Sequence, residues 1–563
     1  MKKIPFVLMS LTALTTILMG ACGGRSSNES PRLSIHQIER IDQKTVDLSD
    51  QLDIAPESSK GSAQFADLVS AYIAGRARLE RALSMDPLDS MTQDDSRALR
   101  MMRRAFEEEL VPIEALKLSP VDEHVTERNR VDCHYDAEAL AMKGDGYRAL
   151  RRRIFECYKR AARSLTFEGD QVDDLTVWSQ LPLIDEPERR ELLWRSMMPM
   201  WKSFDGYTGS PSPYQLFVQM NAARMKESGE EIGESVRGIG VDPELMERWL
   251  VRVLEKWREI APNTTMEPWD FLYLAGSAHR QLIDDIPLES LRALNDRFYR
   301  DLGADPVTLG VQYDLEPGPD KEPFAHATYG RRPRYENDRW VVGQTWVIAS
   351  YGKGGLDNLF EILHETGHAI QLAAIRTRPA FTDMPDSEIF VEGVANIAAL
   401  EIYEPAWQRR YLGRSVPVKD ANVAKYTYIV MEVATGLFEL RMYRDPERDP
   451  DELSSEICDR YFRVRPHTEL AWWGVWPQLI TSPGYMMNYA AGAIMVADLR
   501  VRTHEVCGPY TEGNTSWYGS VSEHLYRFGF ERPSKEVIED FLGRPVSLQA
   551  ILDDMDRARV TAP

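Results

Sequence analysis

One segment of the chain carries two histidines at helical spacing. Residues 356–375 read LDNLFEILHETGHAIQLAAI, in which apolar side chains recur every three to four positions. This pattern predicts a helix, so His364 and His368 lie one turn apart on one face. Two imidazoles at that spacing can bind one zinc ion, and the neighbouring Glu365 can take a proton from an activated water. The alternative is a metal-free, partly exposed helix face.

A catalytic zinc site of this type needs a third ligand, and a second acidic helix follows the first. Residues 387–403 read SEIFVEGVANIAALEIY and predict a helix with Glu388 and Glu392 one turn apart. Glu388 lies 20 residues beyond His368 and Glu392 lies 24 beyond it. We assign Glu392 as the third ligand because of the sequence around it.

That sequence carries a family resemblance. The motif HETGH, followed by Glu392 at the head of Glu-Gly-Val-Ala-Asn, resembles the angiotensin-converting-enzyme-like family of zinc peptidases, the gluzincins. The resemblance implies one Zn²⁺ per chain, held by His364, His368 and Glu392, with Glu365 as general base. Asn396 stands where the family has an aspartate, and its side chain could orient a ligand histidine.

Further similarity lies in scattered blocks between residues 178 and 507. Residues 324–328, Phe-Ala-His-Ala-Thr, resemble the family's Cys-His-Ala-Ser segment. The resemblance implies that His326 donates a hydrogen bond to a substrate peptide carbonyl. A structural role for this histidine is the alternative.

A pair of tyrosines follows nearer the C-terminus. The segment from Gly484 to Tyr489 has the Gly-Tyr-x-x-x-Tyr spacing of the thimet oligopeptidase family, and the preceding Ser-Pro resembles the converting-enzyme family. Tyr485 and Tyr489 lie one turn apart on a predicted helix. They are candidate donors to the oxyanion of peptide hydrolysis, and the alternative is that they pack that helix into the core.

Two positions depart from the converting-enzyme pattern. Gln478 occupies the place of a histidine that stabilises the transition state, and glutamine donates a hydrogen bond without becoming charged. Trp476 stands where a lysine would clamp a substrate C-terminal carboxylate. The removal of C-terminal dipeptides is therefore not supported by these residues.

Three functions remain open from the sequence. The first is a zinc metallopeptidase that hydrolyses extended oligopeptides, with Glu365 as the base. The second is a peptidyl-dipeptidase that releases C-terminal dipeptides. The third is a catalytically weakened, zinc-binding lipoprotein scaffold, suggested by Gln478 and Asn396.

The N-terminus predicts export. Residues 1–21 contain two lysines, an apolar run and small residues, which is typical of a signal peptide. The residues before Cys22 resemble a bacterial lipobox, which implies acylation of Cys22 and a lipid anchor in the cell envelope, on the outer membrane or periplasmic face if the source is Gram-negative. Ordinary secretion is the alternative. Residues 22–63 predict a flexible tether, and residues 64–563 a single large helical domain.

The charge of the chain limits its possible binding partners, and its cysteines limit its possible disulfides. The chain has 67 Lys and Arg against 88 Asp and Glu, a net charge of -21, which argues against a non-specific nucleic-acid binder. The expected partners are peptides and, through the anchor, a membrane, while the oligomeric state stays open. Three pairings are possible if all the cysteines beyond Cys22 are bonded, namely Cys133, Cys157, Cys458 and Cys507.

The remaining pattern predicts the architecture. Helical periodicity dominates from about residue 65 onward, and the clearest strand candidate covers residues 340–349. We therefore expect a mainly α, two-lobed body around a deep central cleft, with a small β-sheet beside the helix of His364.

Overall fold

The computed structural model describes most of the chain. The described residues are 33–55, 59, 62–84, 91–108, 110, 132–172, 174–207, 211–317, 321, 325–336 and 339–559. The predicted signal peptide and Cys22 lie outside these residues. Among the described helices, none combines the length and the apolar character that crossing a bilayer requires.

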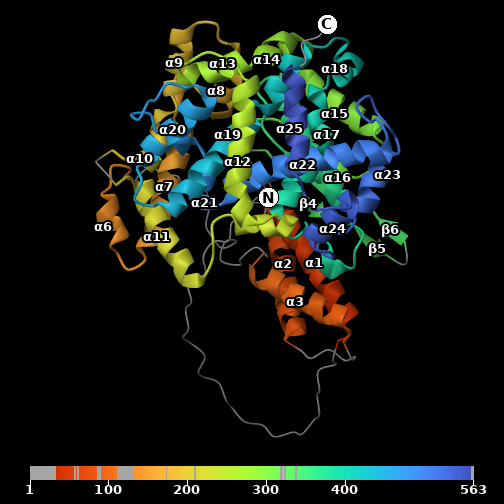
Figure 1. Ribbon diagram of the computed structural model, residues 1–563. Coiled ribbons are helices and arrows are strands. Elements are labelled where there is room, and N and C mark those ends of the chain that lie inside the picture. The colour runs from red at the N-terminus through yellow and green to blue at the C-terminus, as the bar shows by residue number, and fades with distance from the viewer. Residues whose placement is uncertain are drawn as a thin grey trace, which may run out of the picture.

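Three helices form an N-terminal unit, at the lower edge of Figure 1: α1 (Ile35–Asp53), α2 (Ala63–Leu83) and α3 (Gln93–Glu108). The unit has a small apolar core of its own, to which Ile38 and Leu79 belong. A capping box formed by Ser34 and Gln37 begins α1. The prediction of a tether over residues 22–63 was therefore wrong for α1, because its apolar face packs against α2.

Ion pairs join the N-terminal unit to the rest of the molecule. Arg332 lies 3.1 Å from Asp50, and Arg378 lies 2.7 Å from Glu39. Both acidic residues belong to α1 and are buried. The unit is thus fixed over the edge of the central cleft by charge as well as by apolar contact.

The first half of the body is helical, as predicted, and lies mainly to the left in Figure 1. Its helices are α6 (Ala137–Ala141), α7 (Gly146–Ala162), α8 (Asp174–Gln180), α9 (Pro187–Arg195), α10 (Met198–Asp205), α11 (Pro213–Ser228), α12 (Pro243–Ile260), α13 (Phe271–Ala275), α14 (Ser277–Leu282) and α15 (Leu291–Asp301). A short hairpin, β1 (Thr166–Phe167) and β2 (Asp170–Gln171), follows α7. A disulfide between Cys133 and Cys157 ties the segment before α6 to α7, while Cys458 and Cys507 are free thiols.

A small sheet follows α15. Its strands are β3 (Val311–Asp314), β7 (Gln344–Ile348) and β4 (His326–Arg331), in that order. Strand β7 is central, with β3 parallel and β4 antiparallel to it. The edge strand β4 begins at His326.

The single strand expected over residues 340–349 is two strands. Strand β6 (Arg339–Val341) pairs with β5 (Arg334–Glu336) in a separate hairpin, and β7 begins only at Gln344. Gly343 lies between them, where an added Cβ would come within 2.7 Å of the Arg331 carbonyl oxygen. At Gly343 the backbone therefore passes close to that of Arg331, and the chain leaves the β5–β6 hairpin to enter the three-stranded sheet.

The second half of the body is again helical. Its helices are α16 (Leu356–Ala374), α17 (Glu388–Ala399), α18 (Pro405–Leu412), α19 (Val418–Arg444), α20 (Pro450–Phe462), α21 (Gln478–Thr481), α22 (Tyr485–Cys507), α23 (Trp517–Val521), α24 (Ser534–Leu542) and α25 (Gln549–Asp556), with the 3-10 turns η8 (Leu400–Tyr403) and η11 (Arg557–Arg559). One continuous apolar core joins both halves and includes Trp201, Trp257 and Trp407.

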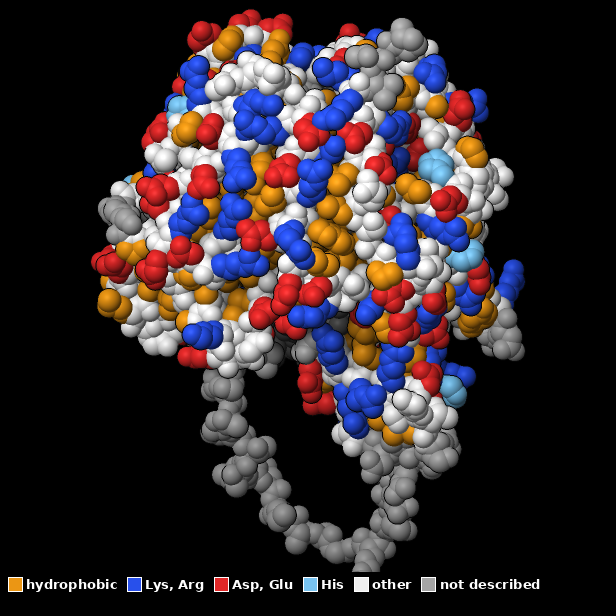
Figure 2. Space-filling model, viewed as in Figure 1, with side chains coloured by type: hydrophobic (Ala, Val, Ile, Leu, Met, Phe, Trp, Pro, Cys, Tyr) orange, Lys and Arg blue, Asp and Glu red, His pale blue; other side chains and the backbone are white. Residues whose placement is uncertain are grey.

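The surface carries charges of both signs. Acidic and basic side chains are interspersed over the face seen in Figure 2. The net negative charge is therefore not gathered into one field on that face.

Candidate metal centre

Helix α16 places the two histidines together. His364 and His368 are one turn apart, and their Nε2 atoms lie 3.1 Å from each other. His368 is 5% exposed, whereas His364 is partly exposed, and both face a cleft of about 1670 Å³. The prediction of a helix over residues 356–375 is confirmed to within one residue.

A glycine between the histidines lets α17 come close. An added Cβ at Gly367 would lie 2.5 Å from the backbone oxygen of Ala395 in α17. No side chain fits in that gap, so the two helices cross with their backbones nearly in contact. This crossing carries the ligand residue of α17 toward the two imidazoles. The motif alone does not predict this role of Gly367.

Glu392 completes the group. Its Oε2 atom lies 3.5 Å from Nε2 of His364 and 3.8 Å from Nε2 of His368. All the ligand atoms lie within 4.8 Å of one another, and among the described residues this is the group of histidine, cysteine and acidic side chains arranged to hold a metal ion. Two imidazoles and one carboxylate are the donor set of a catalytic zinc site, so the residues fit the predicted ion.

The alternative acidic residue lies elsewhere in the cleft wall. Glu388 is one turn before Glu392, and its Oε2 accepts a hydrogen bond of 3.5 Å from Asn488. Glu388 lines the cleft but is not a member of the ligand group. The structure thus favours Glu392 over Glu388, as the sequence context did.

Asn396 orients the first histidine. Its Oδ1 lies 2.9 Å from Nδ1 of His364, while its Nδ2 donates to the backbone oxygen of Glu392 at 3.2 Å. Because the amide oxygen is an acceptor, it favours the tautomer with the proton on Nδ1. That tautomer leaves Nε2 of His364 free for a metal.

The protons of the ligand group are shared unevenly. Burial lowers the pKa of His364, but the hydrogen bond and charge of Glu392 together with Glu365 outweigh it and raise the pKa to about 9. Burial and the charge of His364 lower the pKa of His368 to about 4. Burial opposes ionisation of Glu392, yet hydrogen bonds from both histidines hold its pKa well below the usual range.

Glu365 lies beside the ligands on the cleft side. It is 6% exposed, and among the described residues its Oε2 has no hydrogen-bond partner. Burial raises its pKa to about 7, against the attraction of His364. A carboxyl group with a pKa near neutrality suits proton transfer.

Two further carboxyl groups near the metal centre escaped the sequence analysis. Glu361 lies one turn before Glu365 on α16, and Glu432 comes from α19. Burial raises their pKa values to about 7 and about 8. Both line the cleft, so acidic side chains surround the ligand histidines. Only the position of α19 beside the site reveals Glu432.

The tyrosines lie across the cleft wall at the start of α22. Tyr485 donates a hydrogen bond of 3.2 Å to Oε1 of Glu392. The ring of Tyr489 meets that of Tyr485 edge-on, with centroids 5.0 Å apart, and its hydroxyl is hydrogen-bonded to the side chain of Gln478. Burial raises the pKa of both tyrosines well above the usual value, so both remain O–H donors at neutral pH.

His326 also reaches the cleft. It is the first residue of the edge strand β4 and is paired in register with Ile348 of β7. His326 and Trp476 both line the cleft, on segments far apart in the sequence. The structure thus brings every predicted site residue of the described chain to one cavity, with Asn396 and Gln478 each bonded to a neighbouring site residue.

Comparison with known proteins identifies the fold. No protein-family model matches the chain, and no curated protein matches it. Among solved structures, a protein described as oligoendopeptidase F aligns with a TM-score of 0.54 at 14% identity, over 95% of this chain and 98% of that one. PZ peptidase A with an inhibitor aligns with a TM-score of 0.53 at 14% identity, over 95% and 99%.

A third solved structure gives the same picture. A protein from Bacillus anthracis str. Ames, also described as oligoendopeptidase F, has a TM-score of 0.52 at 13% identity, over 95% of this chain and 97% of that one. The chain therefore has the mainly α fold of these proteins over nearly its full length. The comparisons do not single out the angiotensin-converting-enzyme-like family, so that finer relationship is not shown.

Proposed function

We propose that the chain is a zinc-dependent metallopeptidase that hydrolyses extended oligopeptides. The observation that carries the proposal is the convergence of His364, His368 and Glu392 on one point, with Glu365 beside them, in the wall of a large cleft. Zinc bound by these three residues would polarise a peptide carbonyl and acidify a water molecule.

Glu365 is the proton acceptor in this proposal. Its carboxyl group is buried and faces the cleft next to the ligand histidines. It takes the proton of the attacking water and passes it to the amine that leaves. A cation at the ligands would favour its carboxylate form, because a nearby positive charge lowers the pKa of an acid.

Tyr485 and Tyr489 stabilise the negative charge that develops on the carbonyl oxygen. Both hydroxyl groups stay protonated at neutral pH, and preorganised donors of this kind are strongest in a site that excludes water. Tyr485 donates its hydroxyl proton to Glu392, whereas Tyr489 can accept its hydrogen bond from the amide of Gln478 and so keeps its own O–H for the substrate.

Strand β4 binds the peptide backbone. It is an edge strand, and residues 326–329 line the cleft. An extended peptide can add to such an edge through main-chain hydrogen bonds, which recognise no particular side chain. His326, at the start of the strand, donates to a substrate carbonyl.

A mixed peptide library tests the activity and the cleavage register together. The purified protein should produce new termini in the presence of zinc, and a chelator should abolish them until zinc is restored. Peptides amidated at the C-terminus separate the two registers, because an endopeptidase cuts them and a peptidyl-dipeptidase does not. Stable zinc binding without any new termini would instead support the lipoprotein scaffold.

We propose further that the protein works outside the cytoplasm, lipid-anchored through Cys22 in a bacterial envelope. The disulfide between Cys133 and Cys157 supports this location, because such bonds persist in oxidising compartments. Metabolic labelling with a fatty-acid analogue should mark the wild type and leave Cys22→Ala unlabelled.

A further inference from the structure

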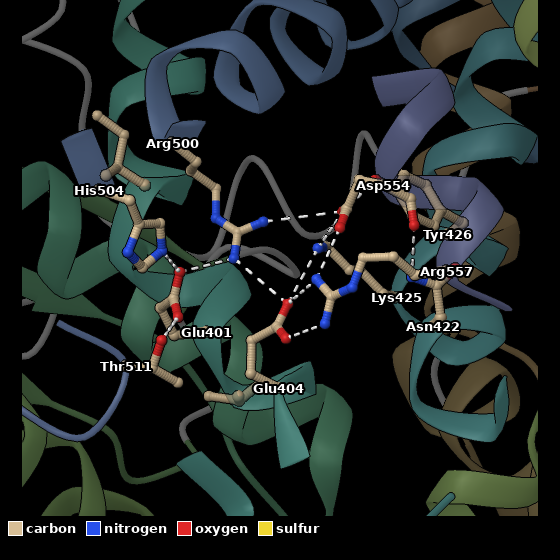
Figure 3. Close-up of polar contacts among 12 residues, drawn as sticks. Glu401, Glu404, Asn422, Lys425, Tyr426, Arg500, His504, Thr511, Asp554 and Arg557 are labelled. Atoms are coloured by element: carbon tan, nitrogen blue, oxygen red, sulfur yellow. Dashed lines mark hydrogen bonds and ion pairs between the residues drawn. The ribbon is translucent and has the colours of Figure 1, made fainter. Parts of the chain in front are cut away.

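A network of mostly buried charged side chains lies where η8, α19, α22 and α25 meet (Figure 3). Arg500 of α22 lies at its middle and donates a hydrogen bond of 2.6 Å to Glu401 of η8. The side chain of Arg500 is 9% exposed and that of Glu401 is fully buried. None of these groups lies in the ligand group, and the proposed chemistry does not use them. The other labelled members are Glu404, Asn422, Lys425, Tyr426, His504, Thr511, Asp554 and Arg557.

The network ties four segments of the chain together. Lys425 of α19 forms an ion pair with Asp554 of α25 and lies 3.6 Å from Glu404, which follows η8. Arg500 lies 3.7 Å from Glu404 and 4.0 Å from Asp554. Arg557 binds Glu404 through both terminal nitrogens. The last helix is thereby joined to the helices that line the cleft.

Helices α17 and α22 run side by side between this network and the metal centre. At one end Tyr485 of α22 donates to Glu392 of α17. At the other end Arg500 of α22 donates to Glu401, just beyond α17. Each segment therefore carries a site residue near its start and a network residue farther along the chain, and on α22 the two are separated by roughly 22 Å at 1.5 Å per residue.

The two helices touch between these ends. A Cβ added to Gly393 would lie 2.2 Å from Cε of Met495 and 3.4 Å from the backbone oxygen of Gly492. Gly492 in turn lies against Ile389 and Gly393. Met495 packs into the space at Gly393 and the rest of this contact is between backbones, so the buried ion pair is a second point that fixes how α22 lies along α17.

We propose that Arg500 is a positioning residue for the metal centre: its ion pair with Glu401 holds α22 against α17, so that Glu392 and the tyrosine pair keep their spacing. A buried ion pair resists displacement because separating the charges leaves each one desolvated and unpaired. A shift of about 1 Å at a catalytic group costs on the order of a hundredfold in rate. Asp554 and Lys425 hold Arg500 and Glu404 in place from the other side.

This inference rests on the proposed function, and a nearby ion pair provides a control. Asp498 lies on the same helix, two residues before Arg500, and is 1% exposed. It accepts hydrogen bonds of 2.6 and 2.7 Å from Arg544 and joins α22 to the chain before α25. Within the described part of the chain, the side chain of Asp498 is bonded to Arg544 and to the backbone N–H of Ser547, and to no residue of α17 or η8. Removing its charge disturbs α22 without touching the Arg500–Glu401 pair.

The experiment compares Arg500→Gln with Asp498→Asn in the full-length protein. The zinc Kd is measured by competition with a chromophoric chelator, and kcat and KM are measured on an oligopeptide at saturating zinc. Arg500→Gln should raise the zinc Kd and lower kcat by about tenfold each, as losing a group that supports a metal ligand does, with KM unchanged. Asp498→Asn should change only the thermal midpoint, and Arg500→Lys should restore part of the loss.

A milder variant covers the case in which Arg500→Gln does not fold. Thr511 donates a hydrogen bond of 2.6 Å to Oε2 of Glu401, so Thr511→Val weakens the same clamp while keeping every charge. It should shift the zinc Kd and kcat in the same direction by a smaller factor. The proposal is overturned if Arg500→Gln or Thr511→Val lowers only the thermal midpoint, or if Asp498→Asn changes zinc affinity equally.

The zinc measurement also separates this inference from the function proposed above. If the wild type binds zinc but cleaves no peptide, the peptidase proposal fails, while the difference in zinc Kd between Arg500→Gln and Asp498→Asn still tests the positioning of Glu392.

Discussion

Two clusters of buried ionisable side chains lie along helices α17 and α22, and they differ in how their charge is balanced. In the network around Arg500, burial raises the pKa of Glu401, but the charges of Arg500 and His504 outweigh it and bring the pKa to about 2. At the metal centre, burial raises the pKa values of Glu361 and Glu432 to about 7 and about 8. Glu401 in the network is balanced by nearby cations, whereas Glu361 and Glu432 at the metal centre are not.

The difference indicates what each cluster is for. A buried carboxylate without a nearby cation is costly, so the protein takes up protons there until a cation is supplied. A divalent metal held by His364, His368 and Glu392 would supply it. The network needs no such addition, and it serves to fix the helices on which the metal centre is built.

Removing a metal ligand should have the largest effect on zinc binding and on peptide hydrolysis. His368→Ala leaves two ligands, and we expect the zinc Kd to rise by at least about a hundredfold, a modest share of the binding free energy of a protein zinc site. Peptide hydrolysis should be lost with the metal. Glu388→Gln is the matched control, because Glu388 lines the same cleft outside the ligand group. Chelator competition on both variants measures the effect, and equal zinc affinity in the two would contradict the assignment.

The tyrosines separate metal binding from catalysis. Tyr489→Phe removes one donor to the developing oxyanion and should lower kcat by about a hundredfold, with the zinc content unchanged. Tyr443→Phe serves as the control, since Tyr443 is a buried tyrosine whose hydroxyl accepts a hydrogen bond of 2.7 Å from Asn221 outside the cleft lining. Steady-state kinetics on a fluorogenic peptide would show the difference. A kcat that falls equally in both variants would point to packing instead.

Asn396 tests how the ligand histidine is oriented. Asn396→Ala removes the acceptor of His364 Nδ1 and should raise the zinc Kd by about tenfold. Asn396→Asp should bind zinc at least as tightly as the wild type, because a carboxylate makes the imidazole a better donor to the metal. Both zinc Kd values come from the same chelator assay. An unchanged Kd in Asn396→Ala would show that Asn396 does not orient His364 for zinc binding.

The smallest effect is expected for Glu439, where burial is the main cause of the pKa shift and the readout is stability as a function of pH. It is fully buried on α19 and accepts a hydrogen bond of 2.7 Å from the backbone N–H of Gly484. Burial raises its pKa to about 8. The folded protein thus binds a proton that the unfolded chain releases near the ordinary pKa of about 4.3, so stability falls as pH rises through that interval.

Glu439→Gln keeps the acceptor and removes the titration. Its thermal midpoint should match that of the wild type at pH 5 and exceed it by a few degrees at pH 8. Thermal unfolding of the two proteins at both pH values measures the change. A variant less stable than the wild type at pH 8 would show that the carboxylate form is favoured at the start of α22.

The local features of the site could be predicted from the sequence. The helical spacing of His364 and His368 and the acidic helix with Glu392 follow from periodicity and from the donor set that zinc requires. The tyrosine pair and His326 came from family resemblance, and the structure places them in the same cleft. Short-range patterns were thus sufficient wherever the chemistry lies on one or two helices.

Features that depend on distant packing could not be predicted. The ion pair of Arg500 with Glu401 joins residues 99 apart in the sequence, and Glu432 reaches the metal centre only because α19 packs beside it. Part of the region expected to be a tether forms α1, a helix rich in charged residues. Its acidic side chains Asp50 and Glu39 form ion pairs with Arg332 and Arg378, which lie far along the chain. Periodicity contains no information about such partners.

Glu365→Gln separates zinc binding from peptide hydrolysis when zinc content and peptide turnover are measured on the same preparation. The substitution keeps the shape of the side chain and leaves all three ligands in place. We expect one zinc ion per chain in both the wild type and the variant, with peptide turnover in the wild type alone. Retained turnover in Glu365→Gln, or a wild type that holds no zinc, would contradict the proposed function.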